Sequence, residues 1–140
     1  MKAPRVVGVA LALFAAVALG GCGGVQSPDL FAVSRDGSIP GARLDLIVSD
    51  NGTVRCNGRA PRLMPNQLLL DAREVERLLK PDAMRGLTIA HTGNAVLTYS
   101  VRDEDGYVSF PDTAAAGRPG LARLALFTRQ AAQQVCGLIR

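Results

Sequence analysis

The sequence contains no tryptophan, a single histidine and few aromatic residues, which make up only 4% of the chain. Sites that stack sugar rings or nucleic-acid bases are built on aromatic side chains, so such a platform is poorly supplied here. A Ser/His/Asp or Cys/His catalytic arrangement would have to use His91, which has no GxSxG motif nearby. We therefore expect His91 to be a surface loop residue and the chain not to be an enzyme.

Motifs for phosphate, acid/base or metal chemistry are also missing. No glycine-rich loop follows a strand and opens a helix, so nucleotide binding has no support. Glu74 and Glu76 stand two positions apart on a predicted helix and do not face each other. The run 103–106 lacks the Asp-x-Asp-x-Asp-Gly spacing of a calcium loop, and Ala114 stands where an EF-hand has its closing glutamate. We expect no metal or cofactor, and a polar hairpin turn at 103–106, with weak cation binding as the alternative.

What the sequence does contain is typical of one globular domain. Its 140 residues are 48% hydrophobic and 20% charged, and its glycines and prolines are scattered without a repeat. The formal net charge is +4, but Lys2 and Arg5 lie in a segment that we expect to be removed. The remaining arginines are interleaved with Asp and Glu instead of forming a basic stripe, so no nucleic-acid partner is expected.

Residues 1–21 have the order of features of a secretory signal peptide. Lys2 and Arg5 make the start positive, residues 6–19 are uncharged and apolar, and small residues follow. A translocase holds the charged end inside and a processing peptidase needs a small-residue site, so this order predicts export. The apolar run is short for a membrane-spanning helix, which needs roughly 20 residues.

The signal ends in Leu19-Gly20-Gly21-Cys22, which resembles the processing site of bacterial lipoproteins. The resemblance implies cleavage between Gly21 and Cys22, and lipidation of Cys22 by a thioether-linked diacylglycerol and usually an amide-linked acyl chain. Two or more chains anchor a protein stably, so it also implies a location at the cell membrane, on the extracytoplasmic side. The alternatives are a plain signal peptide with an incidental cysteine, or an uncleaved anchor.

The chain is thus expected to divide into a signal peptide (1–21), a lipidated cysteine with a flexible tether (22–29) and a single domain (30–140). The tether sequence Gly-Gly-Val-Gln-Ser-Pro is typical of a flexible linker and reaches roughly 20 Å at most. The domain is therefore expected close to the membrane.

With Cys22 assigned to lipid, Cys56 and Cys136 remain as an even pair in an exported chain, which predicts one disulfide. Their spacing excludes a CxxC redox motif, and two thiols with one histidine make a poor zinc site. Two unpaired buried thiols are the alternative.

Apolar and alternating stretches predict short strands. An apolar-rich run at 30–35 is followed by strands at 42–48, 53–57, 86–90, 95–102 and 107–110. Asp50-Asn51-Gly52 predicts a tight hairpin turn, because Asn and Gly tolerate positive φ. Asn51-Gly52-Thr53 also spells a glycosylation acceptor, but the turn interpretation is favoured. A second hairpin is expected between 86–90 and 95–102.

Two helices are predicted by apolar residues at three- and four-residue spacing. The first runs from about 67 to 80, with Asn66 as its cap and Pro81 as its end. Pro119 opens the second, and 59–65 and 111–117 are expected to be irregular. The second helix has one apolar stripe: Leu121, Leu124, Ala125, Thr128, Ala131, Ala132, Val135 and Ile139. Together these elements predict an α+β domain, a small antiparallel sheet of about five strands with two helices packed against it.

The order of these elements, with Leu97–Val101, Tyr107–Asp112 and a proline-initiated helix, resembles small lipoproteins of high-GC bacteria. In outline it is also similar to emfourin, a proteinaceous inhibitor of thermolysin-like metalloproteases. The chain departs from emfourin in its export signal, its lipid anchor and its cysteine pair. The resemblance implies the architecture, and no inhibitory residue is carried over.

The leading functional hypothesis is a non-catalytic, lipid-anchored domain that binds another envelope protein. The first alternative is a protease inhibitor or modulator of the emfourin type, which would present 59–65 or 111–117 as an extended segment. The second is a small-molecule or ion carrier, which would need a pocket between sheet and helices.

Overall fold

The computed structural model describes residues 29–138. The predicted signal peptide, its Gly21–Cys22 cleavage site, the lipidation of Cys22 and most of the tether lie outside this range, as does Ile139. The elements in chain order are β1 (Asp29–Gly37), β2 (Leu44–Ser49), β3 (Thr53–Cys56), β4 (Arg62–Leu63), α1 (Asn66–Met84), β5 (Leu97–Asp103), β6 (Tyr107–Pro111), the 3-10 helix η1 (Asp112–Gly117) and α2 (Pro119–Gln134).

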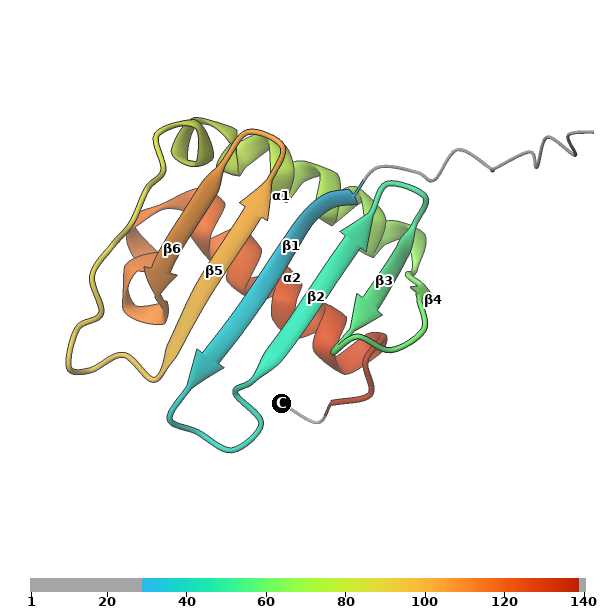
Figure 1. Ribbon diagram of the computed structural model, residues 1–140, viewed down its shortest axis with the longest axis horizontal. Helices are drawn as coiled ribbons and strands as arrows, with labels where there is room; N and C mark the ends of the chain where they lie inside the picture. Colours follow the sequence, from blue (N-terminus) through green and yellow to red (C-terminus); the bar gives the residue numbers. More distant parts are fainter. Residues whose placement is uncertain (1–28, 139–140) are drawn as a thin grey trace, which may run out of the picture.

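The fold is the predicted α+β arrangement. Six strands form one antiparallel sheet in the order β4-β3-β2-β1-β5-β6. Both α1 and α2 lie on the same face of this sheet, and within residues 29–138 no helix covers the other face (Figure 1). The apolar face of a sheet has to be covered by another layer, whereas a polar face can stay in contact with water. The alternation of apolar and polar residues along the strands therefore fits two layers, one of sheet and one of helices.

Alternation along the strands decides which side chains face the helices. In β1, Phe31, Val33 and Arg35 are buried while Ala32 and Asp36 are exposed. The ring of Phe31 meets that of Phe127 from α2 edge to face, with centroids 5.5 Å apart. This contact joins the central strand to α2 through the middle of the core.

The predicted hairpin turn at 50–52 is confirmed. β2 pairs antiparallel with β3, with Leu46 opposite Cys56. Gly52 adopts a φ of 85°, and the Asn51 side-chain oxygen accepts a hydrogen bond from the Thr53 backbone N–H at 3.0 Å. Gly52 thus supplies the positive φ and Asn51 the side-chain hydrogen bond, which are the two properties that favour Asn-Gly in a tight hairpin turn.

The ends predicted for the first helix are wrong. Pro65 occupies the N-cap position, no side chain caps the helix, and Pro81 lies inside α1, which continues to Met84. A proline removes one helical hydrogen bond, but burial of Ala83 against the core holds the last turn in place. Tertiary packing thus outweighs the local stop signal here.

The predicted hairpin between 86–90 and 95–102 is also wrong. The Ile89 N–H donates to the Ser109 carbonyl at 2.8 Å, and the Ser109 N–H donates to the Leu87 carbonyl at 2.9 Å, so this segment runs beside β6 as a parallel bridge. β5 pairs with β1 on one side and β6 on the other, which leaves it no free edge for the segment 86–90.

Two segments expected to be irregular are ordered in part. Arg62 and Leu63 form β4, which pairs with β3 and adds a strand to the expected number. The segment 111–117 comprises the last residue of β6 and η1, so it is not an extended loop. Two residues between prolines have no periodicity to reveal a strand.

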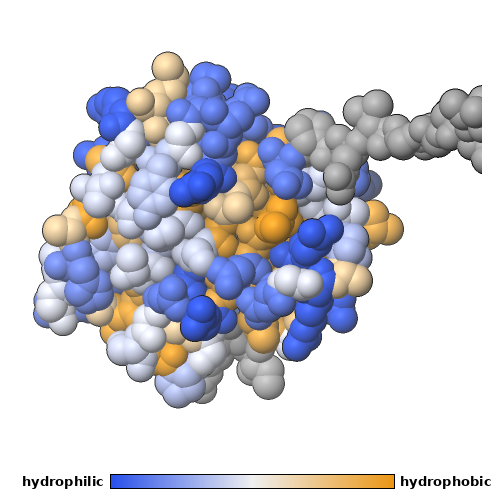
Figure 2. Space-filling view, viewed as in Figure 1, coloured by the Kyte–Doolittle hydropathy of each residue, from blue (hydrophilic) through white to orange (hydrophobic). Residues whose placement is uncertain are grey.

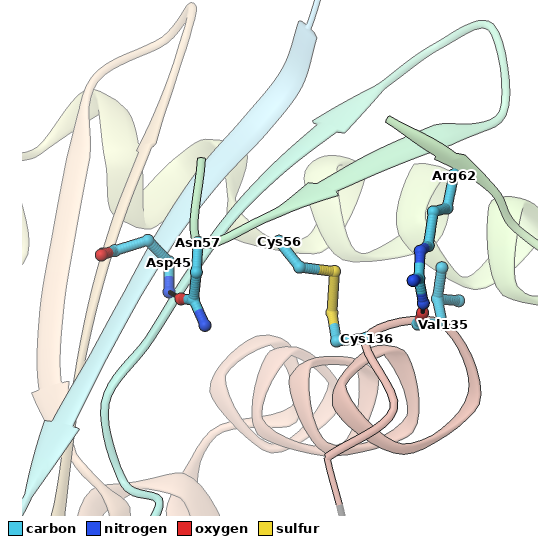
Figure 3. Close-up of a disulfide and its surroundings, with 6 residues drawn as sticks. All are labelled: Asp45, Cys56, Asn57, Arg62, Val135 and Cys136. Carbon is cyan, nitrogen blue, oxygen red and sulfur yellow. Dashed lines mark hydrogen bonds between the residues drawn. A yellow bond between two sulfur atoms is a disulfide. The ribbon is translucent and has the colours of Figure 1, made fainter. Parts of the chain in front are cut away.

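The predicted disulfide is present, between Cys56 at the end of β3 and Cys136 just beyond α2 (Figure 3). The two Cα atoms are 5.8 Å apart, a normal spacing for such a bond. Beside it, the Arg62 guanidinium donates to the Val135 carbonyl at 2.9 Å. The bond ties the end of the last helix to β3 of the first hairpin, and the Arg62 contact ties it to β4.

The helix-free face of the sheet is polar around a small apolar area. Figure 2 shows an apolar patch in the middle of this face, bordered by hydrophilic side chains. A shallow depression there includes Ala32 and Ile47, with Ser34, Asp45 and Arg102 among its polar neighbours. Within residues 29–138, no helix is long and apolar enough to cross a membrane.

Candidate functional site

A groove of about 540 Å³ lies between α2 and the end of the sheet where β1 turns into β2. Its volume falls among those of pockets that hold small organic molecules, roughly 300–1,000 Å³. We call it the Arg35 groove. Its lining residues are Arg35, Ile39, Pro40, Gly41, Ala42, Leu97, Tyr99, Ala115, Ala116, Ala122, Ala125, Leu126, Arg129 and Gln133.

Arg35 is a buried charge in this groove, only 4% exposed. Its Nε donates to the Ala42 carbonyl at 2.8 Å and its Nη2 donates to the Gly41 carbonyl at 3.0 Å. Gly41 adopts a φ of 75°, a conformation that favours glycine, in the loop that supplies both carbonyls. These oxygens hold the guanidinium but carry no full charge, and no carboxylate of residues 29–138 forms an ion pair with it.

Arg129 adds a second positive charge from α2. Its side chain is exposed, lines the groove and forms no ion pair with any carboxylate in the described part of the chain. The lining residues include these two arginines and no acidic residue. The groove is therefore positively charged at neutral pH.

Tyr99 adds a phenol to the lining of the groove. It pairs with Arg35 across β1 and β5, and its ring stacks on Phe110 with centroids 5.1 Å apart. Burial raises the pKa of the Tyr99 phenol, and the nearby Asp112 carboxylate also raises it, while the charges of Arg35 and Arg129 lower it. Tyr99 is therefore protonated at neutral pH and its hydroxyl can donate a hydrogen bond.

These groups suit a molecule with an anionic group and an apolar body. Guanidinium groups bind carboxylates and phosphates by charge-assisted hydrogen bonds, which are stronger when partly shielded from water. Apart from Gln133, the remaining lining side chains are apolar, from Ile39 and Pro40 in the loop to Leu126 on α2.

Sequence reasoning counted Arg35 among the arginines interleaved with acids and did not single it out. The signal that could have found it is its register, because it follows Phe31 and Val33 at period two on the buried side of β1. A charged residue at a core-facing strand position is unusual. Tyr99, in contrast, stands on the alternating face predicted for 95–102, and it is buried.

Neither His91 nor the acidic turn at 103–106 lines the groove. His91 is exposed, with its Nδ1 3.3 Å from the Thr98 hydroxyl. The polar turn predicted at 103–106 is confirmed, since the Asp103 carboxylate accepts hydrogen bonds from the N–H groups of Asp105 and Gly106 at 2.9 and 2.8 Å. Within residues 29–138, no three His, Cys, Asp or Glu side chains gather in a way that could hold a metal ion.

Glu74 and Glu76, both on α1, lie in different electrostatic surroundings. Glu74 contacts Arg123 of α2 at 3.5 Å. Partial burial raises the pKa of Glu76, and nearby carboxylates, led by those of Glu104 and Asp103, raise it further. Glu76 therefore sits in an acidic environment in which its charged form is disfavoured.

Replacing Glu76 with glutamine is expected to stabilise the domain at neutral pH by up to about 0.5 kcal/mol. The pKa of Glu76 in the folded state lies above its ordinary value of 4.5, so the folded state binds this proton more tightly than the unfolded state. The stability that the proton contributes is present below pH 4.5 and lost as the pH rises through the folded pKa. Urea unfolding at pH 4 and pH 7.5 should show the gain only at the higher pH.

Glu74→Gln on the same helix is the matched control, because it removes the contact with Arg123 and should bring no gain. Equal effects of Glu76→Gln at both pH values would contradict the electrostatic explanation.

Comparisons of the chain with protein-family models, with curated proteins and with solved structures find no match.

Proposed function

We propose that this chain is an extracytoplasmic protein, anchored to the cell membrane through lipidated Cys22, that binds a small amphipathic anion in the Arg35 groove. The observation that carries the proposal is the buried guanidinium of Arg35, held by two carbonyls in an aliphatic groove without a carboxylate partner in residues 29–138. A buried charge is costly unless paired, and a bound anion would supply the missing counter-charge.

The predicted tether supports a role close to the membrane surface. Amphipathic molecules gather there, and a tether of at most roughly 20 Å would keep the groove within their reach. Among the functions predicted from the sequence, the groove thus supports the small-molecule carrier.

The predicted envelope-protein partner stays a prediction. Inhibition of the emfourin type would need an extended segment, which 111–117 does not offer because it is largely helical. The other candidate, 59–65, is exposed at most positions but contains β4, and Arg62 is bound to Val135.

The test is saturable binding of 1-anilinonaphthalene-8-sulfonate, an aromatic anion that fluoresces in apolar surroundings, to the chain without its first 22 residues. All the core residues of the structure lie within 29–138, so this form retains the whole described domain. We expect one site per chain, and about tenfold weaker binding for Arg129→Gln, since a hydrogen bond to a charged group is worth about 1.5 kcal/mol or more.

Arg123→Gln is the matched control, because it makes the same change on α2 at a residue that contacts Glu74 and does not line the groove. Near-UV circular dichroism of each variant should be native-like, since this probe also binds loosened cores. Absence of saturable binding, or equal losses in both variants, would refute the proposal.

A further inference from the structure

The Arg35 groove changes character along its length. α2 contributes Ala122, Ala125 and Leu126 to it first, and Arg129 and Gln133 afterwards. With a rise of 1.5 Å per residue, Ala122 and Arg129 stand about 10 Å apart along the helix. One end of the groove is therefore charged and polar, and the other is apolar.

The apolar end is lined by small and aliphatic side chains. η1 contributes Ala115 and Ala116, and β5 contributes Leu97. Because alanine side chains are short, they leave space in the groove between η1 and α2. None of these residues has a side chain that can form a hydrogen bond. This end of the groove therefore fits a hydrocarbon tail and provides no hydrogen-bond partner for a polar tail.

The charged end suits a flat group with a single negative charge. Arg35 donates its Nε–H to the Ala42 carbonyl and one N–H of Nη2 to the Gly41 carbonyl. Of its five N–H groups, three remain, and one on Nη1 together with the second on Nη2 forms the outer edge of the guanidinium. Two parallel hydrogen bonds from such an edge match the two oxygens of a carboxylate. A dianion would be costlier to place beside a group this deeply buried.

We propose that the ligand class of the Arg35 groove is the linear aliphatic carboxylate, with its head at Arg35 and Arg129 and its tail toward Ala122 and η1. This inference rests on the proposed function and narrows it to one chemistry. An extended chain advances about 1.2 Å per bond, so a 10 Å tail site seats about eight bonds. The best ligand therefore has about nine carbon atoms.

The test is displacement of anilinonaphthalene sulfonate, checked by calorimetry, with unbranched carboxylates of four to fourteen carbons, below their micelle concentrations. Affinity is expected to rise about two- to threefold per methylene, as for a partly buried group, and to level off near nine carbons. The primary alcohol and the alkyl phosphate with nine carbons should each bind at least tenfold more weakly than nonanoate.

Ala122→Leu separates the tail site from the head site. Ala122 is exposed on α2 and leucine is a good helix former, so folding should be unaffected. The larger side chain fills the apolar end, and nonanoate should bind about tenfold more weakly while butyrate binds as before. Ala60→Leu, the same change at an exposed position outside the groove, should leave the whole series unchanged.

Each outcome decides between the two claims. Saturable, Arg129-dependent binding of the sulfonate that no carboxylate displaces would overturn this inference and leave the proposed function in place. Affinity that keeps rising to fourteen carbons, or an Ala122→Leu profile equal to that of the original chain, would also overturn it. Absence of saturable sulfonate binding would refute the proposed function and this inference together.

Discussion

Replacing Cys56 and Cys136 together with alanine is expected to lower the free energy of unfolding by about 4–5 kcal/mol. The two cysteines are 80 positions apart in the sequence, and closing so long a loop removes much of the entropy of the unfolded chain. Domains of this size are commonly stable by only 5–15 kcal/mol, so the loss is a large share of the total. Urea unfolding, followed by circular dichroism, measures the change.

Two controls separate the cross-link from its surroundings. Arg62→Gln removes the hydrogen bond to the Val135 carbonyl beside the disulfide and should cost no more than about 1–2 kcal/mol. Treatment of the original chain with a reductant should reproduce most of the loss seen in the double alanine variant. Unchanged stability after reduction would show that packing of α2 alone holds the C-terminal part to the first hairpin.

Replacing Cys22 with alanine is expected to move nearly all of the processed protein, which no longer carries residues 1–21, from the membrane fraction to the soluble fraction. Each buried methylene of an acyl chain contributes about 0.8 kcal/mol to membrane binding, so loss of two or more chains removes essentially the whole attraction. The domain offers no replacement in residues 29–138, where no helix could span a membrane. Fractionation of cells, with immunoblotting of each fraction, measures the distribution.

The double alanine variant at Cys56 and Cys136 is the matched control, because it also lacks cysteines but keeps Cys22. It should remain in the membrane fraction and incorporate labelled palmitate, which Cys22→Ala should not. A Cys22→Ala protein that is still processed and still bound to membranes would show that the lipobox interpretation is wrong.

Local patterns predicted most of the elements correctly. The alternation in 95–102 anticipated the burial of Tyr99 and Val101, and the Asn51-Gly52 pair marked the turn between β2 and β3. These predictions succeeded because the period of an exposed or buried face and the φ of a turn depend on neighbouring residues alone. The cysteine pair was also predictable, since two cysteines left over in a chain that is expected to be exported have only each other.

Predictions that depended on competition between segments failed. Pro81 is a strong local stop, but the packing of Ala83 carries α1 past it. The residues 86–90 have the composition of a hairpin strand, yet β5 pairs with β1 and β6 instead, and they run beside β6. No pattern within one segment reveals which strand another segment will pair with.

The sequence by itself determined the kind of elements, the α+β class, the disulfide partners and the expectation of an exported, lipidated chain, because each follows from short-range chemistry or composition. Only the tertiary structure decided the strand order and the existence of the Arg35 groove. Arg35 and Arg129 are far apart in the chain, and they line one groove because α2 crosses behind β1 on the helix-covered face of the sheet. A site assembled from distant elements depends on how their faces pack, and that information is held by the whole core at once.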